Sequence, residues 1–163
     1  IIHIVFATFW AGGAFSLAMF ILPSINSTQP EGGKVMQKML FTYRFPQYMT
    51  IAGLLTVLSG LWLYYHLSFG FQMTWIKTPH GLTLLIGGLA AILAFLHGIT
   101  SNRPKAIRMG KIGRAIMDAG GTPTEAQVAE IVKLRKALTT GTNVVAILIL
   151  VAVICMAAAQ YVN

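Results

Sequence analysis

The chain has 163 residues, of which 56% are hydrophobic and only 10% are charged, and its net charge is +8. Soluble domains average about 25% charged residues, so the polar side chains are too few to cover a water-exposed surface, and the composition indicates an integral membrane protein. The positive charge does not indicate nucleic-acid binding, because eleven of the twelve basic residues lie in two segments, 34–44 and 103–136. Such asymmetry between loops sets the orientation of membrane proteins.

Four apolar stretches of about 20 residues, the length needed to cross the hydrocarbon core, predict four transmembrane spans. They cover residues 1–22, 47–67, 79–100 and 142–161. Pro23 is predicted to end the first span, and turn-forming residues then lead to a short amphipathic segment at 35–44. Residues 101–137 are predicted to form a basic helical loop between spans three and four, with a helix-start signature at Thr122–Glu125. We therefore expect a single all-α domain over residues 1–163, an antiparallel four-helix transmembrane bundle.

Because successive spans alternate in direction, the two termini and the link between spans two and three are expected on one side of the membrane. The basic segments, including the loop at 101–137, are expected on the other side. The excess of Lys and Arg marks that side as cytoplasmic. We therefore expect a multi-pass protein of a bacterial inner (plasma) membrane, with both termini on the periplasmic side.

Three histidines, His3, His66 and His80, occur at the predicted periplasmic ends of three different spans. His97 lies about 25 Å from His80 along the third span and cannot share a metal ion with it. Ionisable side chains in spans are costly and are functional by default. Two imidazoles that face each other across a bundle can hold a haem iron from both sides. We predict His66 as one axial ligand and His3 or His80 as the other.

The residues around these histidines suggest how a haem would be surrounded. The ring is expected among aromatic side chains, which are Phe6, Trp10, Tyr64 and Trp75. Lys77, the only basic residue on that side, is placed to pair with a haem propionate. Tyr64 and Trp75 also fit an interfacial aromatic belt, and Lys77 also fits a headgroup anchor.

Copper is the alternative metal. Three imidazoles with the thioether of Met73 or Met156 would suit it, because imidazole and thioether ligands both bind copper. The four acidic residues all fall on the predicted cytoplasmic side. The spans therefore lack the carboxylates expected of a proton-driven transporter.

Several short motifs connect these residues to a known group. They are His3 followed by F-x-x-F-W-A-G-G, the R-F-P before span two, the L-S-G-L-W-L-Y-Y-H that closes it, Trp75 with Lys77, and M-A-A-A-Q-Y-V near the C-terminus. On these residues the chain resembles the four-helix membrane modules of the copper-resistance D protein and the related HemJ-type membrane haem proteins. The resemblance implies haem b or copper at the positions of His3, His66 and His80. Span one has L-A-M-F-I-L-P-S where HemJ has L-P-R-L-F, which counts against porphyrinogen oxidation.

The sequence thus predicts a membrane-embedded b-type haem protein that transfers electrons to or from a periplasmic protein or a quinone. It would serve as an electron-transfer subunit of a membrane oxidoreductase, and enzymatic activity of its own is left open. The alternatives are a copper-binding or copper-transfer protein and a non-catalytic structural subunit of a larger membrane complex. The Gly-rich helix faces also suit packing between copies of the chain, so a homo-oligomer is a further alternative.

Overall fold

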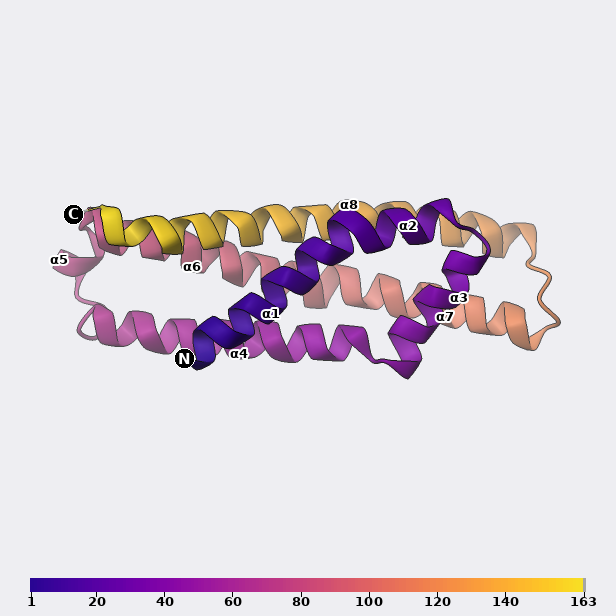
Figure 1. Cartoon of the computed structure of the whole chain (residues 1–163), viewed down its shortest axis with the longest axis horizontal. Coiled ribbons are helices and arrows are strands. Elements are labelled where there is room, and N and C mark those ends of the chain that lie inside the picture. Colours follow the sequence, from indigo (N-terminus) through magenta and orange to yellow (C-terminus); the bar gives the residue numbers. More distant parts are fainter. Residues whose placement is uncertain (163) are drawn as a thin grey trace.

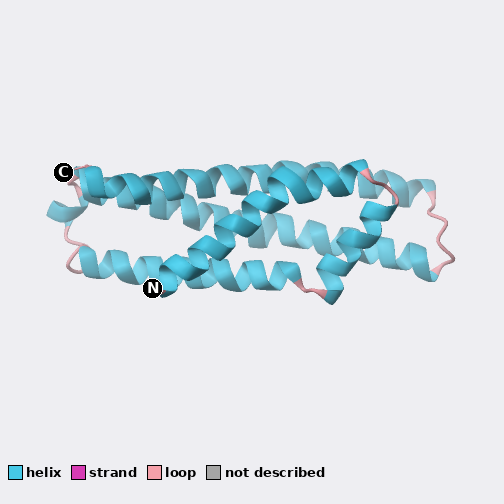
Figure 2. Ribbon diagram, in the orientation of Figure 1, coloured by secondary structure: helices cyan, strands magenta, loops and turns pink. Residues whose placement is uncertain are grey.

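A computed structural model describes residues 1–162, and these residues contain helices and connecting loops but no strand (Figure 2). The α-helices are α1 (Ile2–Ser16), α2 (Leu22–Ser27), α3 (Glu31–Gln37), α4 (Phe45–Leu67), α5 (Met73–Ile76), α6 (Pro79–His97), α7 (Arg103–Asp118) and α8 (Glu125–Ala158). Three π-helical segments, Leu17–Ile21, Lys38–Thr42 and Gly98–Asn102, and a 3₁₀ turn, Ala159–Tyr161, continue individual helices. The predicted all-α class is confirmed.

The helices join into four rods that are long and apolar enough to cross a membrane, by length and composition. They run over Ile2–Ser27, Phe45–Leu67, Pro79–Asp118 and Glu125–Tyr161. Large apolar side chains are exposed along all four rods, for example Phe20, Leu58, Leu93 and Ile154. Exposed apolar side chains on every rod suit a lipid environment and not water. The chain is therefore a multi-pass membrane protein.

The rods lie roughly along one long axis (Figure 1). Helix α6 packs along α8, and α1 crosses α4 obliquely. The link that contains α5 lies at one end of the molecule beside the C-terminus, and the link from α7 to α8 lies at the other end. We call the first the histidine end, because α4 reaches His66 and α6 begins near His80 there. The second is the basic end.

Three of the rods extend beyond the predicted spans. Pro23 does not end the first rod, because it stands in the first turn of α2, directly after the π-helical segment Leu17–Ile21. A proline in a first turn sacrifices no hydrogen bond that the new helix needs. The predicted basic loop consists of α7 and the first turns of α8, which prolong spans three and four without a break. Only residues 119–124 separate the two helices.

Small residues hold the middle of the molecule together. A buried cluster contains five alanines from α4, α6 and α8, which are Ala52, Ala90, Ala91, Ala94 and Ala152. Alanines let helix backbones approach closely, and close packing is the main attraction between helices in lipid. A second buried cluster, around Leu22, Met36 and Leu138, holds α2 and α3 against α7 and α8 at the basic end.

Candidate functional site

The imidazole of His3 is held against α4 by its Nδ1 atom. Nδ1 lies 3.0 Å from the carbonyl oxygen of Thr56 and 3.3 Å from Oγ of Ser59. A carbonyl oxygen can only accept a hydrogen bond, so Nδ1 carries the hydrogen that it donates to Thr56. In the neutral ring, Nε2 of His3 then keeps its lone pair.

Gly60 explains how the ring can lie so close to α4. A Cβ atom at this position would stand 2.9 Å from Cε1 of His3, closer than carbon atoms pack. The sequence T-V-L-S-G in α4 thus supplies a carbonyl oxygen, a hydroxyl and a gap on one helix face. Thr56, Ser59 and Gly60 are only small or weakly polar by residue type, and the structure is needed to pair them with His3.

His80 shows the same arrangement on a different pair of helices. Its Nδ1 atom lies 2.7 Å from the carbonyl oxygen of Ala159, a residue with no exposed surface at the end of α8. Nδ1 therefore carries the hydrogen, and Nε2 keeps its lone pair. The ring is placed by the start of α6, where Thr78 caps the helix by accepting a hydrogen bond from the amide of Gly81 at 3.0 Å.

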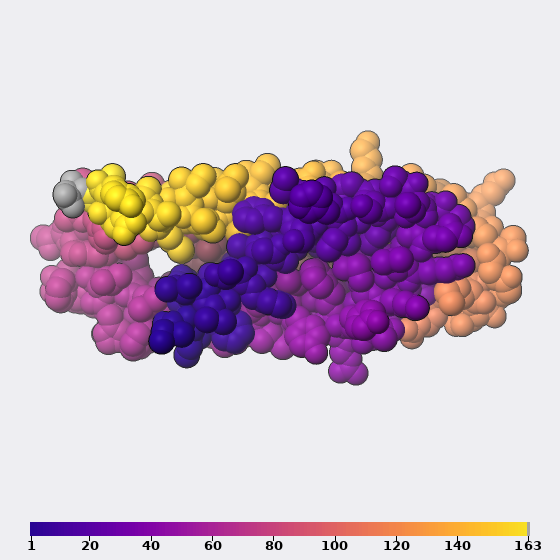
Figure 3. Space-filling model, viewed as in Figure 1, coloured from indigo at the N-terminus to yellow at the C-terminus, as the bar shows by residue number. Residues whose placement is uncertain are grey.

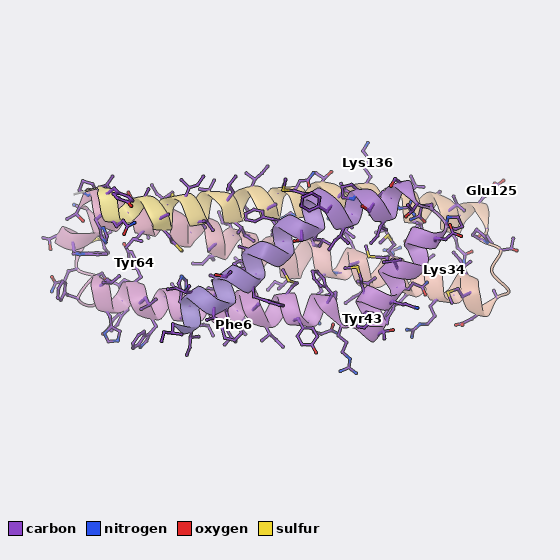
Figure 4. All side chains as sticks on the ribbon, viewed as in Figure 1. Phe6, Lys34, Tyr43, Tyr64, Glu125 and Lys136 are labelled. Atoms are coloured by element: carbon purple, nitrogen blue, oxygen red, sulfur yellow. The ribbon has the colours of Figure 1, made fainter. Side chains whose placement is uncertain are left out.

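An aromatic group surrounds His80. The ring of Trp75 lies 5.7 Å from the ring of His80 and 5.5 Å from the ring of Tyr64, in both cases edge to face. The hydroxyl of Tyr64 donates to the carbonyl oxygen of Gly81 at 3.2 Å. Figure 4 shows Tyr64 reaching from α4 toward α6. Tyr64 and Trp75 are thus brought together with His80.

A cavity of about 350 Å³ lies between the helices beside this group, and its wall is mostly apolar. Its lining includes His3, Tyr64 and Met156, so an imidazole and a thioether border the same space, whereas His80 is not part of this wall. Figure 3 shows an opening between the start of α1, the end of α8 and the segment around α5 in this part of the molecule. The volume falls within the range of small-molecule and cofactor sites, about 300–1,000 Å³.

His66 lies apart from the residues of α4 that hold His3. It is exposed on α4, and its ring contacts that of Trp62, which is 62% exposed, at a centroid distance of 4.3 Å. His66 follows Gly60, the neighbour of His3, by six residues. That separation places it about 9 Å further along α4 and about 120° around the helix. The described residues contain no group of three His, Cys, Asp or Glu side chains that could hold a metal ion.

The other predicted site residues are spread over the molecule. Trp10 is 6% exposed and packs edge to face on Phe95 at 6.3 Å, bordering a separate cavity of about 120 Å³. Phe6 packs against the same buried cluster as Trp10. Lys77 is exposed at the end of α5, three residues before His80. Of this set, only Lys77 lies close in sequence to the His80 group.

One polar pair was not singled out from the sequence as a pair. His97 Nε2 and Asn102 Oδ1 are both buried, and within residues 1–162 neither has a hydrogen-bond partner. They flank the π-helical segment Gly98–Asn102 and face Gly141 of α8, where a Cβ atom would overlap Asn102 Oδ1 and stand 3.2 Å from His97 Nε2. Such π-helical segments are frequent at functional sites. The spacing of His97 and Asn102 is not a helical one, so periodicity could not have paired them.

Searches of protein-family models, curated proteins and solved structures found no match to this chain.

Proposed function

We propose that the chain is a membrane-embedded b-type haem protein in which His3 and His80 are the axial ligands. The observation that carries the proposal is the shared hydrogen-bonding pattern of the two rings. Each donates Nδ1–H to a backbone carbonyl oxygen, at 3.0 Å for Thr56 and 2.7 Å for Ala159. Metal-binding histidines almost always donate their other nitrogen in this way, because the bond fixes the tautomer and raises the basicity of Nε2.

The proposal includes a topology. The four rods cross the membrane as an antiparallel bundle, with α7 and the first turns of α8 on the cytoplasmic side and the histidine end on the periplasmic side. His3 and His80 are then at the outer leaflet. Bound haem supplies a one-electron carrier there, accessible to a periplasmic protein or a quinone.

The surrounding side chains have distinct tasks in this proposal. Trp75, whose ring contacts those of His80 and Tyr64, provides with Tyr64 a flat apolar surface beside one ligand and limits the access of water there. Lys77, exposed beside the start of α6, pairs with a propionate at the water interface. His66, the ligand predicted from the sequence, is exposed and lacks the carbonyl partner that orients His3 and His80, so the proposal places it outside the ligand pair.

Copper binding is the second candidate, and one observation favours it. His3 and Met156 line the same cavity, and an imidazole with a thioether is a donor set that binds copper. Within the described residues, no third His, Cys or carboxylate completes such a site. Haem therefore has the stronger support.

The test is a metal and absorption analysis of the whole chain, purified in detergent from membranes of cells that make haem. We expect a red sample with about one haem per chain and a Soret band that shifts on reduction with dithionite. His3→Ala and His80→Ala should lose the haem while remaining in the membrane, and the matched control His66→Ala should retain it. A colourless sample with stoichiometric copper would replace the haem proposal by the copper one. A sample without either metal would overturn both and leave a structural subunit.

A further inference from the structure

The basic end contains a cavity that the proposed haem site does not use. It measures about 290 Å³ and lies between α2, α3, α7 and α8. Its polar lining includes two cations, Lys34 and Arg135, and the amide side chain of Gln37. The apolar side chains of Leu22, Met36 and Leu138 form another part of the wall. A space with cations on one part of its wall and apolar carbon on another is suited to an amphiphilic anion.

The two charged residues that line this cavity, Lys34 and Arg135, are both positive. None of the four acidic residues lines it. Glu130, the acid in the same part of α8, forms an ion pair with Arg108. Lys34 and Arg135 therefore face the cavity without a carboxylate on its wall to neutralise them. Arg in particular suits a phosphate group, because its guanidinium can donate two parallel hydrogen bonds to phosphate oxygens.

A glycine on α7 makes room for the amide. A Cβ atom at Gly113 would overlap Nε2 of Gln37, so a larger residue would displace this side chain from the wall. Gln37 thus contributes two N–H donors beside Lys34. Lys34 and Gln37 are neighbours on α3, three residues apart.

The position of the cavity along the molecule points to a lipid. It shares Leu22, Met36 and Leu138 with the neighbouring cavity of about 120 Å³, which is lined by Trp10 and Phe45 of the candidate spans. The apolar part of the wall therefore adjoins the spans. In the topology of the proposed function, which this inference takes over, the cations then stand near the cytoplasmic surface of the bilayer. Basic pockets between helices on the cytoplasmic side bind anionic lipid headgroups.

We propose that this cavity binds the headgroup of an anionic phospholipid. Lys34 and Arg135 contact the phosphate, Gln37 donates hydrogen bonds to it, and the apolar wall accepts the beginning of an acyl chain. The site is independent of haem, because none of its residues borders the cavity at the histidine end.

Two other lysines of α8 provide a matched control for the positive charge of the proposed lipid site. Lys133 and Lys136 carry the same charge on the same helix as Arg135. Both are exposed, as Lys34 is, but neither lines the cavity. Figure 4 shows Lys136 projecting away from the body of the molecule, whereas Lys34 lies on α3 where α3 passes over α7. Replacing either pair removes two positive charges from the basic end.

The experiment is native mass spectrometry of the full chain released from nanodiscs of phosphatidylcholine with or without phosphatidylglycerol. We expect one retained phosphatidylglycerol per chain and none or little phosphatidylcholine. The double variant Lys34→Gln with Arg135→Gln should lose this preference, with each lost contact weakening retention about tenfold. Lys133→Gln with Lys136→Gln should keep it, and so should the charge-conserving variant Lys34→Arg with Arg135→Lys.

Three outcomes would overturn the proposal. Equal loss in both charge-removing variants would show only a general attraction of the basic surface to anionic membranes. Equal retention of phosphatidylcholine would remove the role of the net negative charge. Displacement of the lipid by millimolar inorganic phosphate or glycerol phosphate would identify the site as one for a free phosphate compound. If the double glutamine variant fails to fold, Lys34→Gln alone, at an exposed position, takes its place. It should weaken retention about tenfold, and unchanged retention would overturn the proposal.

Discussion

The Nδ1 atom of His80 lies 2.7 Å from the carbonyl oxygen of Ala159, so the first turn of α6 is tied to the last residues of α8 across 79 positions of sequence. One side chain thus performs two tasks in our proposal. The Nδ1–H bond fastens two helices, and Nε2 is left to bind iron. Substitutions can separate these tasks.

We predict that His80→Gln preserves the fold but loses the haem. The glutamine amide can still donate to the carbonyl of Ala159, but glutamine has no imidazole nitrogen to offer iron. His80→Ala, by contrast, leaves that carbonyl oxygen with only the long 3.4 Å bond from the amide of Val162, at a cost of about 0.5–1.5 kcal/mol in the free energy of unfolding. Thermal unfolding in detergent and the Soret absorbance measure the two effects separately. Full haem retention in His80→Gln would remove His80 from the ligand pair.

A second prediction concerns the glycine under the other ring. In Gly60→Ala the new methyl group would stand 2.9 Å from Cε1 of His3, so the imidazole must move away from Thr56. We expect a shifted Soret maximum or a lower haem content, with a stability cost of about 1–3 kcal/mol for the added carbon. Gly88→Ala is the matched control, because Gly88 lines the same cavity but a Cβ there meets nothing within 4 Å. Identical spectra for both variants would contradict the proposed role of His3.

The sequence was sufficient for the all-α class and the four membrane-crossing rods, because both follow from long apolar runs. It also placed the start of α8, since Thr124 and Gln127 form the predicted kind of helix cap. It could not place Pro23 inside a continuing rod, because a π-helical segment changes the hydrogen-bond pairing without any residue signature. The apolar runs therefore located the four spans, but they did not locate every residue at which a helical rod ends.

The candidate site was harder to read from the sequence. Depth in the membrane follows from position along a span, so the sequence brought His3, His66 and His80 to one end. Direction around the helix depends on how the helices pack, and it separates exposed His66 from the ring of His3. The partners of the rings are backbone carbonyl oxygens, which every residue has, so no residue type could reveal them.

The contact between Gly141 and the buried pair His97 and Asn102 yields a third prediction. Gly141→Ala would place a carbon against Asn102 Oδ1 and within 3.2 Å of His97 Nε2, which forces α8 away from α6. We expect a loss of about 1–3 kcal/mol in the free energy of unfolding, visible as a lower melting temperature in detergent. Gly12→Ala is the control, since a Cβ there meets nothing and alanine favours a helix by about 1 kcal/mol. An unchanged melting temperature for Gly141→Ala would show that the pair is not held against α8.

A fourth prediction concerns the cap at the start of α8. The Thr124 hydroxyl accepts from the amide of Gln127 at 3.3 Å, and the Gln127 side chain accepts from the amide of Thr124 at 2.9 Å. Thr124→Ala should destabilise the first turns of α8 by about 1 kcal/mol. Hydrogen–deuterium exchange should then quicken severalfold near Glu125 and stay unchanged deeper in α8. The control Thr140→Ala, at an exposed position within α8, should leave exchange at Glu125 as it is.

The last prediction tests the proposed orientation. Lys111 lies on α7 at the basic end and Lys77 lies on the α5 link at the histidine end, and both are exposed. In a background with Cys155→Ala, which removes the chain's own thiol, Lys77→Cys should react with a membrane-impermeant maleimide added outside cells whose inner membrane is intact. Lys111→Cys should react only after that membrane is permeabilised, because an excess of Lys and Arg keeps a short segment in the cytoplasm. The reverse pattern would place His3 and His80 at the cytoplasmic leaflet. That result would contradict both the proposed outer-leaflet haem site and its periplasmic electron-transfer partner.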